Sequence, residues 1–259
     1  MSVISANLEW LFTEAGERTS DRVRAAAAQG IRYVEIWGWR GKDVPAIADA
    51  LEQTGVRLLT MIVDPQLQLT DPATHNAYIE AVSASLEHAQ KLRVPFLVAV
   101  AGDERQGVPR AEQRAAVVAA LRRAAAALEG SQVTLLLENL NSAVDHPGTY
   151  LDSVREGLEI VRSVGSPHVK LLLDAYHALV MGEDPAATVG ADGELIGHVQ
   201  LADVPGRHEP GTGGVEWNQL LRALRDAGYR GPWGMEYRPT RDTAESLAEV
   251  ERVIADRAE

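Results

Sequence analysis

Eight short apolar segments alternate with longer amphipathic segments along this sequence, and the alternation limits the possible folds more than any other feature. The apolar segments, rich in strand-forming residues, span residues 3–8, 32–37, 57–63, 95–100, 133–139, 169–176, 198–203 and 231–237. Apolar residues at helical spacing fill 21–29, 44–55, 77–92, 111–130, 152–165, 217–228 and 243–258. The remaining interval, 184–197, is short and interrupted by glycine, so it predicts the weakest helix. Eight strand–helix units in 259 residues predict a single (β/α)8 TIM barrel, an α/β catalytic domain over residues 1–259.

An open, doubly wound sheet would show a similar alternation of strands and helices. Such a sheet normally carries a G-x-G-x-x-G turn after its first strand, where it binds a nucleotide. The segment ANLEWLFTEAGERT, which follows the first predicted strand, contains no such turn. No linker or shift in composition suggests a second domain, so the barrel is the better prediction.

Charge and cysteine content exclude several classes of function. The formal net charge of −12 and the pI of about 5.1 disfavour nucleic acid and anionic membranes as partners. Cysteine is absent, which excludes disulfides and thiol chemistry. The segment MSVISANLEWLF lacks the features of a signal peptide, and no apolar run approaches the ~18 residues of a membrane span. We therefore expect a cytoplasmic protein with a small-molecule substrate, and a homo-oligomer is compatible with this sequence.

Oxygen-bearing side chains stand at the ends of the last four predicted strands. They are Glu138, Asp174, Gln200 and Glu236. In a TIM barrel the strand ends meet at the rim where catalysis occurs, and strand alternation places Leu136, Leu172, His198 and Gly234 one layer deeper. A single acid in this position is more often a helix cap, but four consecutive strands ending this way predict a shared site. Three carboxylates and an amide oxygen suit one Mg²⁺ or Mn²⁺ ion.

Further polar and aromatic side chains follow the predicted strands. His177 lies three residues beyond Asp174, where it could contact a substrate or simply bind backbone. Trp37 ends the second strand and could either wall a small-molecule pocket or pack against the rim. His198 is expected to be a satisfied histidine of the barrel interior.

The segment ADVPGRHEPGTGG, residues 202–214, follows the seventh predicted strand and is rich in glycine and proline. Its backbone is expected to close over the site, where Arg207 could offer a two-pronged donor to a substrate carboxylate and His208 could also contact the substrate. Glu209 would then orient Arg207 or His208. The alternative is a solvent-exposed loop whose charges only pair with one another.

The segments LLLENLN, LLLDAYHAL, HVQLADVPGRHEPGTG and GMEYRPT together resemble the hydroxypyruvate isomerase-like family of the xylose isomerase-like TIM barrels. The resemblance implies that Glu138, Asp174, Gln200 and Glu236 bind one divalent cation. It also implies that Glu138 and Glu236 form an acid/base pair, and that His177 and Arg207 contact the substrate. The family interconverts hydroxypyruvate and tartronate semialdehyde by proton transfer between adjacent carbons. Relatives isomerise or epimerise sugars and keto acids, and some dehydrate cyclic polyols.

One segment departs from the family pattern. After the third strand, family isomerases tend to carry a glycine-rich loop, whereas this chain reads DPQLQLTDPATHN over residues 64–76. Because this loop helps to shape the pocket, the resemblance leaves the substrate open while the metal site is unaffected.

The leading hypothesis is thus a metal-dependent isomerase that moves a proton between adjacent carbons of a small 2-hydroxycarbonyl acid or sugar through an enediolate. An epimerase or a dehydratase on the same metal site is the main alternative. A non-catalytic sugar-binding barrel is a further one, because a fold alone does not establish activity. An abasic-site endonuclease would need a histidine-rich multi-zinc cluster and a basic groove, and neither is predicted here.

Overall fold

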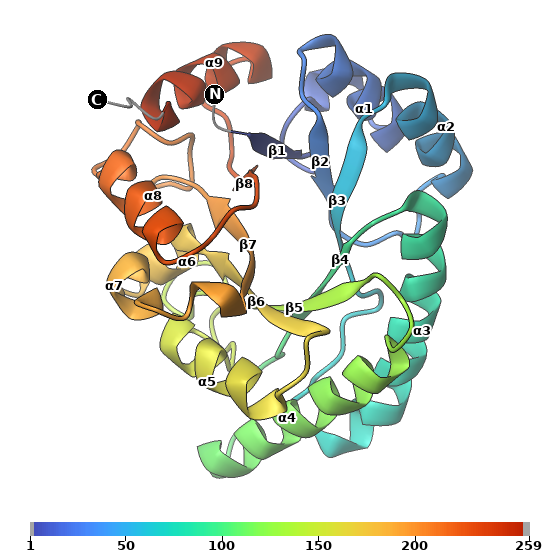
Figure 1. Cartoon of the computed structure of the whole chain (residues 1–259), viewed down its shortest axis with the longest axis vertical. Helices are drawn as coiled ribbons and strands as arrows, with labels where there is room; N and C mark the ends of the chain where they lie inside the picture. The colour runs from blue at the N-terminus through green and yellow to red at the C-terminus, as the bar shows by residue number, and fades with distance from the viewer. Residues whose placement is uncertain (1–2, 256–259) are drawn as a thin grey trace.

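The structure, a computed structural model, describes residues 3–255 and contains a closed barrel of eight parallel strands. Each strand pairs with the next, and the last pairs with the first (Figure 1). The strands are β1 Ile4–Asn7, β2 Tyr33–Ile36, β3 Arg57–Ile62, β4 Phe96–Val100, β5 Thr134–Glu138, β6 Val169–Asp174, β7 Ile196–Leu201 and β8 Trp233–Met235. The predicted TIM barrel is confirmed.

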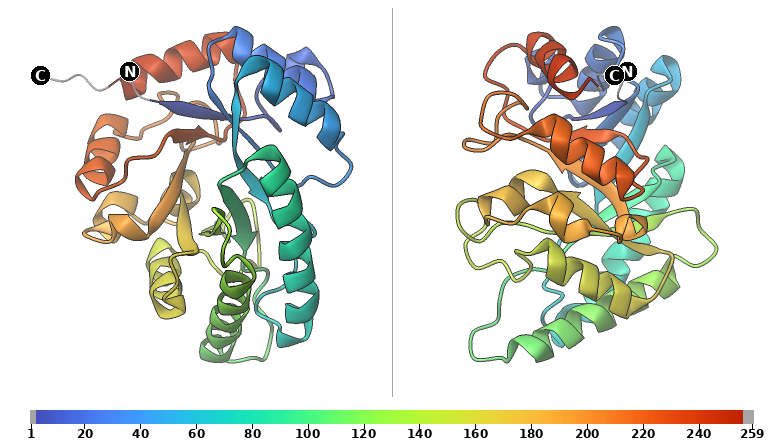
Figure 2. Two further views of the ribbon diagram at one scale, coloured as in Figure 1. Left: turned by 45° about the vertical axis from the view of Figure 1, so that its right-hand side comes forward. Right: turned by 60° about the vertical axis from the view of Figure 1, so that its left-hand side comes forward.

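Helices connect the strands and form an outer ring around them (Figures 1 and 2). They are α1 Thr19–Ala28, α2 Val44–Thr54, α3 His75–Leu92, α4 Arg110–Ala127, α5 Val154–Val164, α6 Ala175–Val180, α7 Pro185–Val189, α8 Trp217–Asp226 and α9 Thr243–Ile254. Short 3-10 helices occupy η1 Thr13–Ala15, η2 Pro72–Thr74 and η3 Gly193–Leu195. The last helix was predicted to reach residue 258, and residues 256–258 lie outside the described part of the chain. Between residues 3 and 255, no helix is both long enough and apolar enough to cross a bilayer.

Helix α5 shows how the local sequence sets the helix bounds. The Ser153 side chain accepts a hydrogen bond from the Glu156 backbone N–H and caps the first turn. Gly165 adopts a left-handed conformation with φ 69° and ends the helix, as glycine commonly does after the last turn. Leu158 and Val161 on its apolar face are buried against the barrel. The amphipathic pattern and the two caps therefore indicate the same bounds for α5.

The region after β6 differs from the prediction. The predicted strand over 169–176 ends at Asp174, because the Asp174 carboxylate accepts a hydrogen bond from the His177 backbone N–H and caps α6. The predicted weak helix over 184–197 is only the five-residue α7 followed by η3, and β7 already begins at Ile196. Asp174 is both the end of a strand and the cap of a helix. Because Ala175 and Tyr176 beyond it are apolar, the sequence pattern extends the strand over them, whereas they begin α6.

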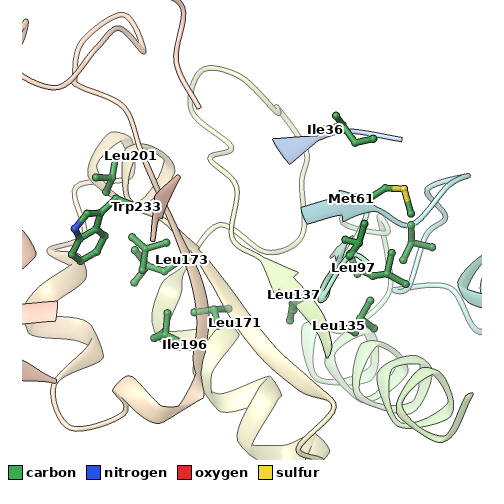
Figure 3. Packing of buried hydrophobic residues seen from close by; sticks show 14 of the residues in the cluster. Ile36, Met61, Leu97, Leu135, Leu137, Leu171, Leu173, Ile196, Leu201 and Trp233 are labelled. Carbon is green, nitrogen blue, oxygen red and sulfur yellow. The ribbon is translucent and has the colours of Figure 1, made fainter. Parts of the chain in front are cut away.

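Alternate residues of each strand pack in two different layers. Outward-facing residues meet the helices, and Figure 3 shows part of this layer, including Leu97, Leu135, Leu137, Leu171 and Trp233. Inward-facing Val98, Leu136 and Leu172 form a separate apolar cluster. Each fully buried Leu side chain contributes about 1.5–3 kcal/mol through the hydrophobic effect.

The other half of the barrel interior is polar. Five fully or almost fully buried side chains fill it: Ser5, Glu35, Thr60, His198 and Gln200. Hydrogen bonds join Glu35 of β2 to His198 and Gln200 of β7, two strands that are not neighbours, so these bonds cross the interior. The interior positions predicted for Leu136, Leu172 and His198 are thereby confirmed.

Candidate active site at the carboxyl ends of the strands

A cavity of about 670 Å³ opens at the carboxyl ends of the strands. Its lining includes Trp10, Trp37, Glu138, His177, Arg207 and Glu236. The loop after β3, which departs from the family pattern, also lines the cavity through Gln66, Leu67 and Gln68. The side chain of Gln68 is held in place because its Oε1 accepts a hydrogen bond of 2.5 Å from the Asp103 backbone N–H. This loop therefore does shape the pocket.

The three predicted acidic residues are buried at this rim. Glu138 ends β5, Asp174 ends β6, and Glu236 follows β8 directly. Their exposed fractions are 8%, 1% and 4%. Ligand atoms of Glu138, Asp174 and His177 all lie within 4.8 Å of one another. Glu236 lies near enough to interact electrostatically with Glu138 and Asp174, so the three acids would repel one another if all were ionised without a cation.

Arg207 supplies one cation between these acids. Its Nη2 donates to Asp174 Oδ2 at 3.3 Å and to Glu236 Oε2 at 3.2 Å. The guanidinium lies over the rings of Trp10 and Tyr176, at 4.7 and 4.9 Å from their centroids. Its Nε is buried and has no hydrogen-bond partner among residues 3–255. Arg207 also has φ 58°, a conformation that costs energy in a non-glycine residue and is typical of functional sites.

The loop that carries Arg207 is anchored by Asp203, which is fully buried. Its Oδ2 accepts hydrogen bonds from the Gly211 N–H at 2.7 Å and from Trp217 Nε1 at 3.0 Å. Its backbone N–H donates to the His208 carbonyl at 2.8 Å. Buried hydrogen bonds therefore hold the loop that carries the guanidinium. The alternative of a solvent-exposed loop whose charges only pair with one another does not describe it.

The pKa values of the three acids in the cavity are all raised in the absence of a metal. Burial raises the pKa of Glu236 to about 7 and of Asp174 to about 6, although the charge of Arg207 opposes both shifts. Burial and the charges of Glu236 and Asp174 also raise the pKa of Glu138 well above its usual value. The Glu138 carboxylate accepts no hydrogen bond from any other described side chain. Acids with such raised pKa values are frequent at functional sites.

Gln200 lies opposite Asp174 on one side and Gly234 on the other in the strand register. Its Nε2 donates to Glu35 Oε2 at 3.0 Å. Its Oε1 is buried and, within the described part of the chain, has no hydrogen-bond partner. An unpaired buried oxygen costs free energy unless a further partner satisfies it. The amide oxygen and the three carboxylates therefore make a donor set that fits a hard divalent cation.

His177 is buried and neutral, because burial and the charge of Arg207 lower its pKa to about 2. Its Nδ1 lies 2.6 Å from Asn141 Nδ2, whose amide oxygen accepts from two backbone N–H groups. Because that amide nitrogen can only donate, Nδ1 accepts and the ring proton lies on Nε2. Nε2 lies 3.5 Å from Asp174 Oδ2, so His177 is a hydrogen-bond donor beside the acids.

Trp37 lines the cavity as predicted and also contacts an acid directly. Its indole Nε1 donates to Glu236 Oε1 at 2.7 Å, and its ring meets Trp10 edge-on at 5.6 Å. The structure places His208 differently from the prediction of substrate contact. Its Nδ1 lies 2.8 Å from the Arg238 carbonyl, and the residue does not line the cavity.

The expected role of Glu209 is wrong. Its carboxylate accepts from the Thr240 N–H at 3.0 Å and from Thr240 Oγ1 at 2.6 Å, and lies 3.4 Å from Arg241 Nε. It therefore joins the loop to the segment after β8 and does not orient Arg207 or His208.

Sequence reasoning missed two polar residues of the site. Asn7 ends β1, and its Nδ2 donates to Glu236 Oε1 at 2.8 Å. Glu35 lies inside the barrel with an exposed fraction of 0%. Applying the strand-end rule to the first strand would have found Asn7, and a lone acid at an inward position of an apolar strand was the available signal for Glu35.

Residues 23–253 match the family described as xylose isomerase-like TIM barrel. The chain belongs to this family. The resemblance to its hydroxypyruvate isomerase-like members is also confirmed by relatives that match over most of the chain.

A relative from Homo sapiens with the provisional name hydroxypyruvate isomerase is 34% identical, and the match covers 94% of this chain and 92% of the relative. The 2-oxo-tetronate isomerase of Cupriavidus necator is 30% identical, with 95% and 96% covered. A crystal structure from Brucella melitensis, described as an AP endonuclease of family 2, superposes with a TM-score of 0.89 at 29% identity, covering 97% of this chain and 99% of that one. The relatives that match over most of the chain carry isomerase names, and they support an isomerase activity.

Proposed function

We propose that this protein is a divalent-metal-dependent isomerase that moves a proton between adjacent carbons of a small 2-hydroxycarbonyl compound. The observation that supports this most is the convergence of three buried carboxylates and one unpaired amide oxygen beside an open cavity. The names of the human and Cupriavidus relatives favour a keto acid of the hydroxypyruvate or oxo-tetronate kind as the substrate.

Glu138, Asp174, Gln200 and Glu236 would hold the metal. When bound, a Mg²⁺ or Mn²⁺ ion would polarise the substrate carbonyl and stabilise the negative charge on its oxygen. Arg207 contacts two of the three carboxylates, so one positive charge faces three acids. A second cation would complete the charge balance and satisfy the Gln200 oxygen.

Glu138 and Glu236 would transfer the proton. One carboxylate removes the proton from the carbon that carries the hydroxyl group, and the other returns a proton to the former carbonyl carbon. Glu138 ends β5 and Glu236 follows β8, so the two residues can face the substrate from two sides.

Other side chains of the cavity would bind and orient the substrate. The free Nε of Arg207 and the Nε2 proton of His177 are donors available to a carboxylate or a carbonyl oxygen. Trp37 would support one face of the substrate and hold Glu236 through its indole nitrogen. His208 is not retained as a substrate contact, because its ring is bound to a backbone carbonyl.

Solvent proton exchange tests the proposal most directly. The Mn²⁺-loaded protein is incubated in D₂O with hydroxypyruvate, four-carbon keto acids and ketoses, and deuterium at the reacting carbon is followed by NMR. We expect deuterium incorporation together with a shift of the carbonyl to the neighbouring carbon, and neither with the Glu138→Gln variant. Incorporation with inversion and no carbonyl shift would indicate an epimerase, and no incorporation into any member of the panel would contradict the proposal.

Cleavage of abasic DNA is disfavoured, although the Brucella structure carries the endonuclease description. The chain has a formal net charge of −12, which opposes binding to a phosphate backbone. Among residues 3–255, the one group of possible metal-binding acids and histidines contains a single histidine. A small anionic or neutral metabolite is the better substrate for this cavity.

A further inference from the structure

Glu35 is a fully buried carboxylate that the proposed chemistry does not use. It lies below the cavity, inside the barrel, and four side chains contact its two oxygens. Oε1 accepts from Ser5 Oγ at 2.5 Å and lies 2.9 Å from His198 Nε2. Oε2 accepts from Thr60 Oγ1 at 3.1 Å and from Gln200 Nε2 at 3.0 Å. Burying a carboxylate in a barrel interior costs free energy unless hydrogen-bond donors meet its oxygens. Here two side chains contact each oxygen.

The amide of Gln200 has its orientation decided by this carboxylate. A side-chain amide has a donor end and an acceptor end of nearly equal size, so packing alone does not distinguish them. A carboxylate can only accept, and therefore the amide nitrogen faces Glu35. The amide oxygen is consequently directed away from Glu35, and it is the end that has no hydrogen-bond partner in the described part of the chain.

The neighbouring strand leaves room for this arrangement at Gly234. A Cβ atom at that position would lie 2.7 Å from Glu35 Oε1, 2.7 Å from His198 Nε2 and 2.9 Å from Gln200 Cγ. No side chain larger than hydrogen fits beside the three residues. The network therefore occupies a space that the barrel keeps open for it.

We propose that Glu35 is a positioning residue, which fixes the Gln200 amide so that its oxygen is directed to the metal. This inference rests on the proposed metal site, and Glu35 itself does not touch the metal or the substrate. Replacing the Glu35 carboxylate by an amide introduces a donor beside Gln200. The Gln200 amide can then reverse and present its N–H₂ group to the cation.

The test measures Mn²⁺ binding to the intact protein through the EPR signal of free Mn²⁺, so it does not depend on activity. Glu35→Gln should raise the Kd for Mn²⁺ by about 10–100-fold, the usual effect of losing a residue that orients a metal ligand. In the Gln200→Ala background the same substitution should change the Kd by less than threefold, because the amide through which it acts is gone. Equal effects in both backgrounds, or no effect in either, would overturn the inference.

The exchanged pair Glu35→Gln/Gln200→Glu provides a second variant with the same total charge. The amide at position 35 now donates to the carboxylate at position 200, whose other oxygen is directed to the metal. We expect this pair to bind Mn²⁺ within tenfold of the unaltered protein or more tightly, even if Glu35→Gln alone does not fold. A folded pair that binds no better than Gln200→Ala would contradict the inference.

Val98→Ala is the matched control for damage to the barrel interior, since Val98 belongs to the apolar cluster in the other half. It should lower the Tm and leave the Kd for Mn²⁺ unchanged. A protein that binds Mn²⁺ through Gln200 but exchanges no substrate proton would refute the proposed function and leave the role of Glu35 intact. Absence of Mn²⁺ binding in the unaltered protein would refute both.

Discussion

At the scale of single residues, the role of Glu138 depends on its free carboxylate. Glu138→Gln removes the proton acceptor and keeps the shape of the side chain, so kcat should fall by about 10²–10⁴-fold. Glu236→Gln should cause a loss of the same order for the same reason. Steady-state kinetics on the substrate found by deuterium exchange checks this, with circular dichroism to show that the fold persists. A kcat close to that of the unaltered protein would remove the altered residue from the mechanism.

Arg207 has two possible roles: it can bind a substrate carboxylate, or it can act only through its contacts with Asp174 and Glu236. If its unpaired Nε binds a substrate carboxylate, Arg207→Lys should raise KM for an acid substrate at least tenfold, about 1.4 kcal/mol. The effect on an uncharged sugar of similar size should be much smaller. Equal increases on both substrates would mean that Arg207 acts only through Asp174 and Glu236.

Protons should compete with the metal for the carboxylates of Glu236 and Asp174. Metal ligands must be deprotonated, and the pKa values of Glu236 and Asp174 are raised to about 7 and about 6. The Kd for Mn²⁺ should therefore fall by roughly tenfold between pH 6 and pH 7.5, as Asp174 and Glu236 lose their protons. Calorimetric titration in buffers of different ionisation enthalpy would detect the released protons. A Kd independent of pH over this interval would contradict the raised pKa values.

The raised pKa values of Glu236 and Asp174 also make the free energy of unfolding of the metal-free protein depend on pH. The folded protein without metal binds these protons more tightly than the unfolded chain, whose acids have ordinary pKa values. Their contribution to the free energy of unfolding is therefore present below pH 4.5 and is lost as the pH rises through 7. Added metal should offset this loss.

Individual site residues were predictable where a repeating rule applied to them. The shared place of Glu138, Asp174, Gln200 and Glu236 at the rim was predictable because each lies at or next to the end of a recognisable strand, and the rim geometry follows from the fold. Glu35 was missed because its partners, His198 and Gln200, lie 163 and 165 positions away, and only the closed barrel brings them together. Glu209 was wrongly placed because a loop's sequence does not say which of several nearby donors its carboxylate will meet.

At the scale of secondary-structure elements, β8 is constrained by its single glycine. Gly234→Ala places a Cβ within 2.7 Å of two polar atoms of the interior network. We expect the free energy of unfolding to fall by about 1–3 kcal/mol, because the neighbouring groups must move. Urea unfolding followed by fluorescence measures this.

Gly214→Ala is a suitable control for the substitution in β8. A Cβ atom at Gly214 meets nothing within 4 Å, and its φ lies outside the left-handed region. The control should show no loss of stability. A Gly234→Ala variant as stable as this control would show that the interior network can shift at little cost.

The existence and order of all eight strands were predicted, and the bounds were predicted well where pattern and length agreed, as in α5. The exception is the region between β6 and β7, where α6 and α7 have six and five residues. Helices this short show too few turns for an apolar period to be distinguished from a strand. Their bounds depend on caps such as Asp174, which also belongs to the site.

At the scale of the whole molecule, the metal should act as a stabilising ligand. Binding at 100 times the Kd contributes about 2.7 kcal/mol, which corresponds to a rise in Tm of roughly 5–10 °C for a chain of this size. Chelation should reverse the rise and eliminate activity, and Mn²⁺ or Mg²⁺ should restore both. Calorimetry with and without chelator provides the measurement. Full activity in protein shown by elemental analysis to contain no metal would contradict the site.

The hydrogen bond from Asn7 to Glu236 joins residues 229 positions apart, across the seam where β1 meets β8. During synthesis at about 5–20 residues per second, the first of these strands leaves the ribosome long before the last one has been made. Until then the growing chain has two unpaired strand edges and lacks one of its three acids. Under the proposed mechanism a chain becomes active only after β8 has been made, so prematurely terminated chains are expected to be inert. A chaperone would bind at the open seam between β1 and β8.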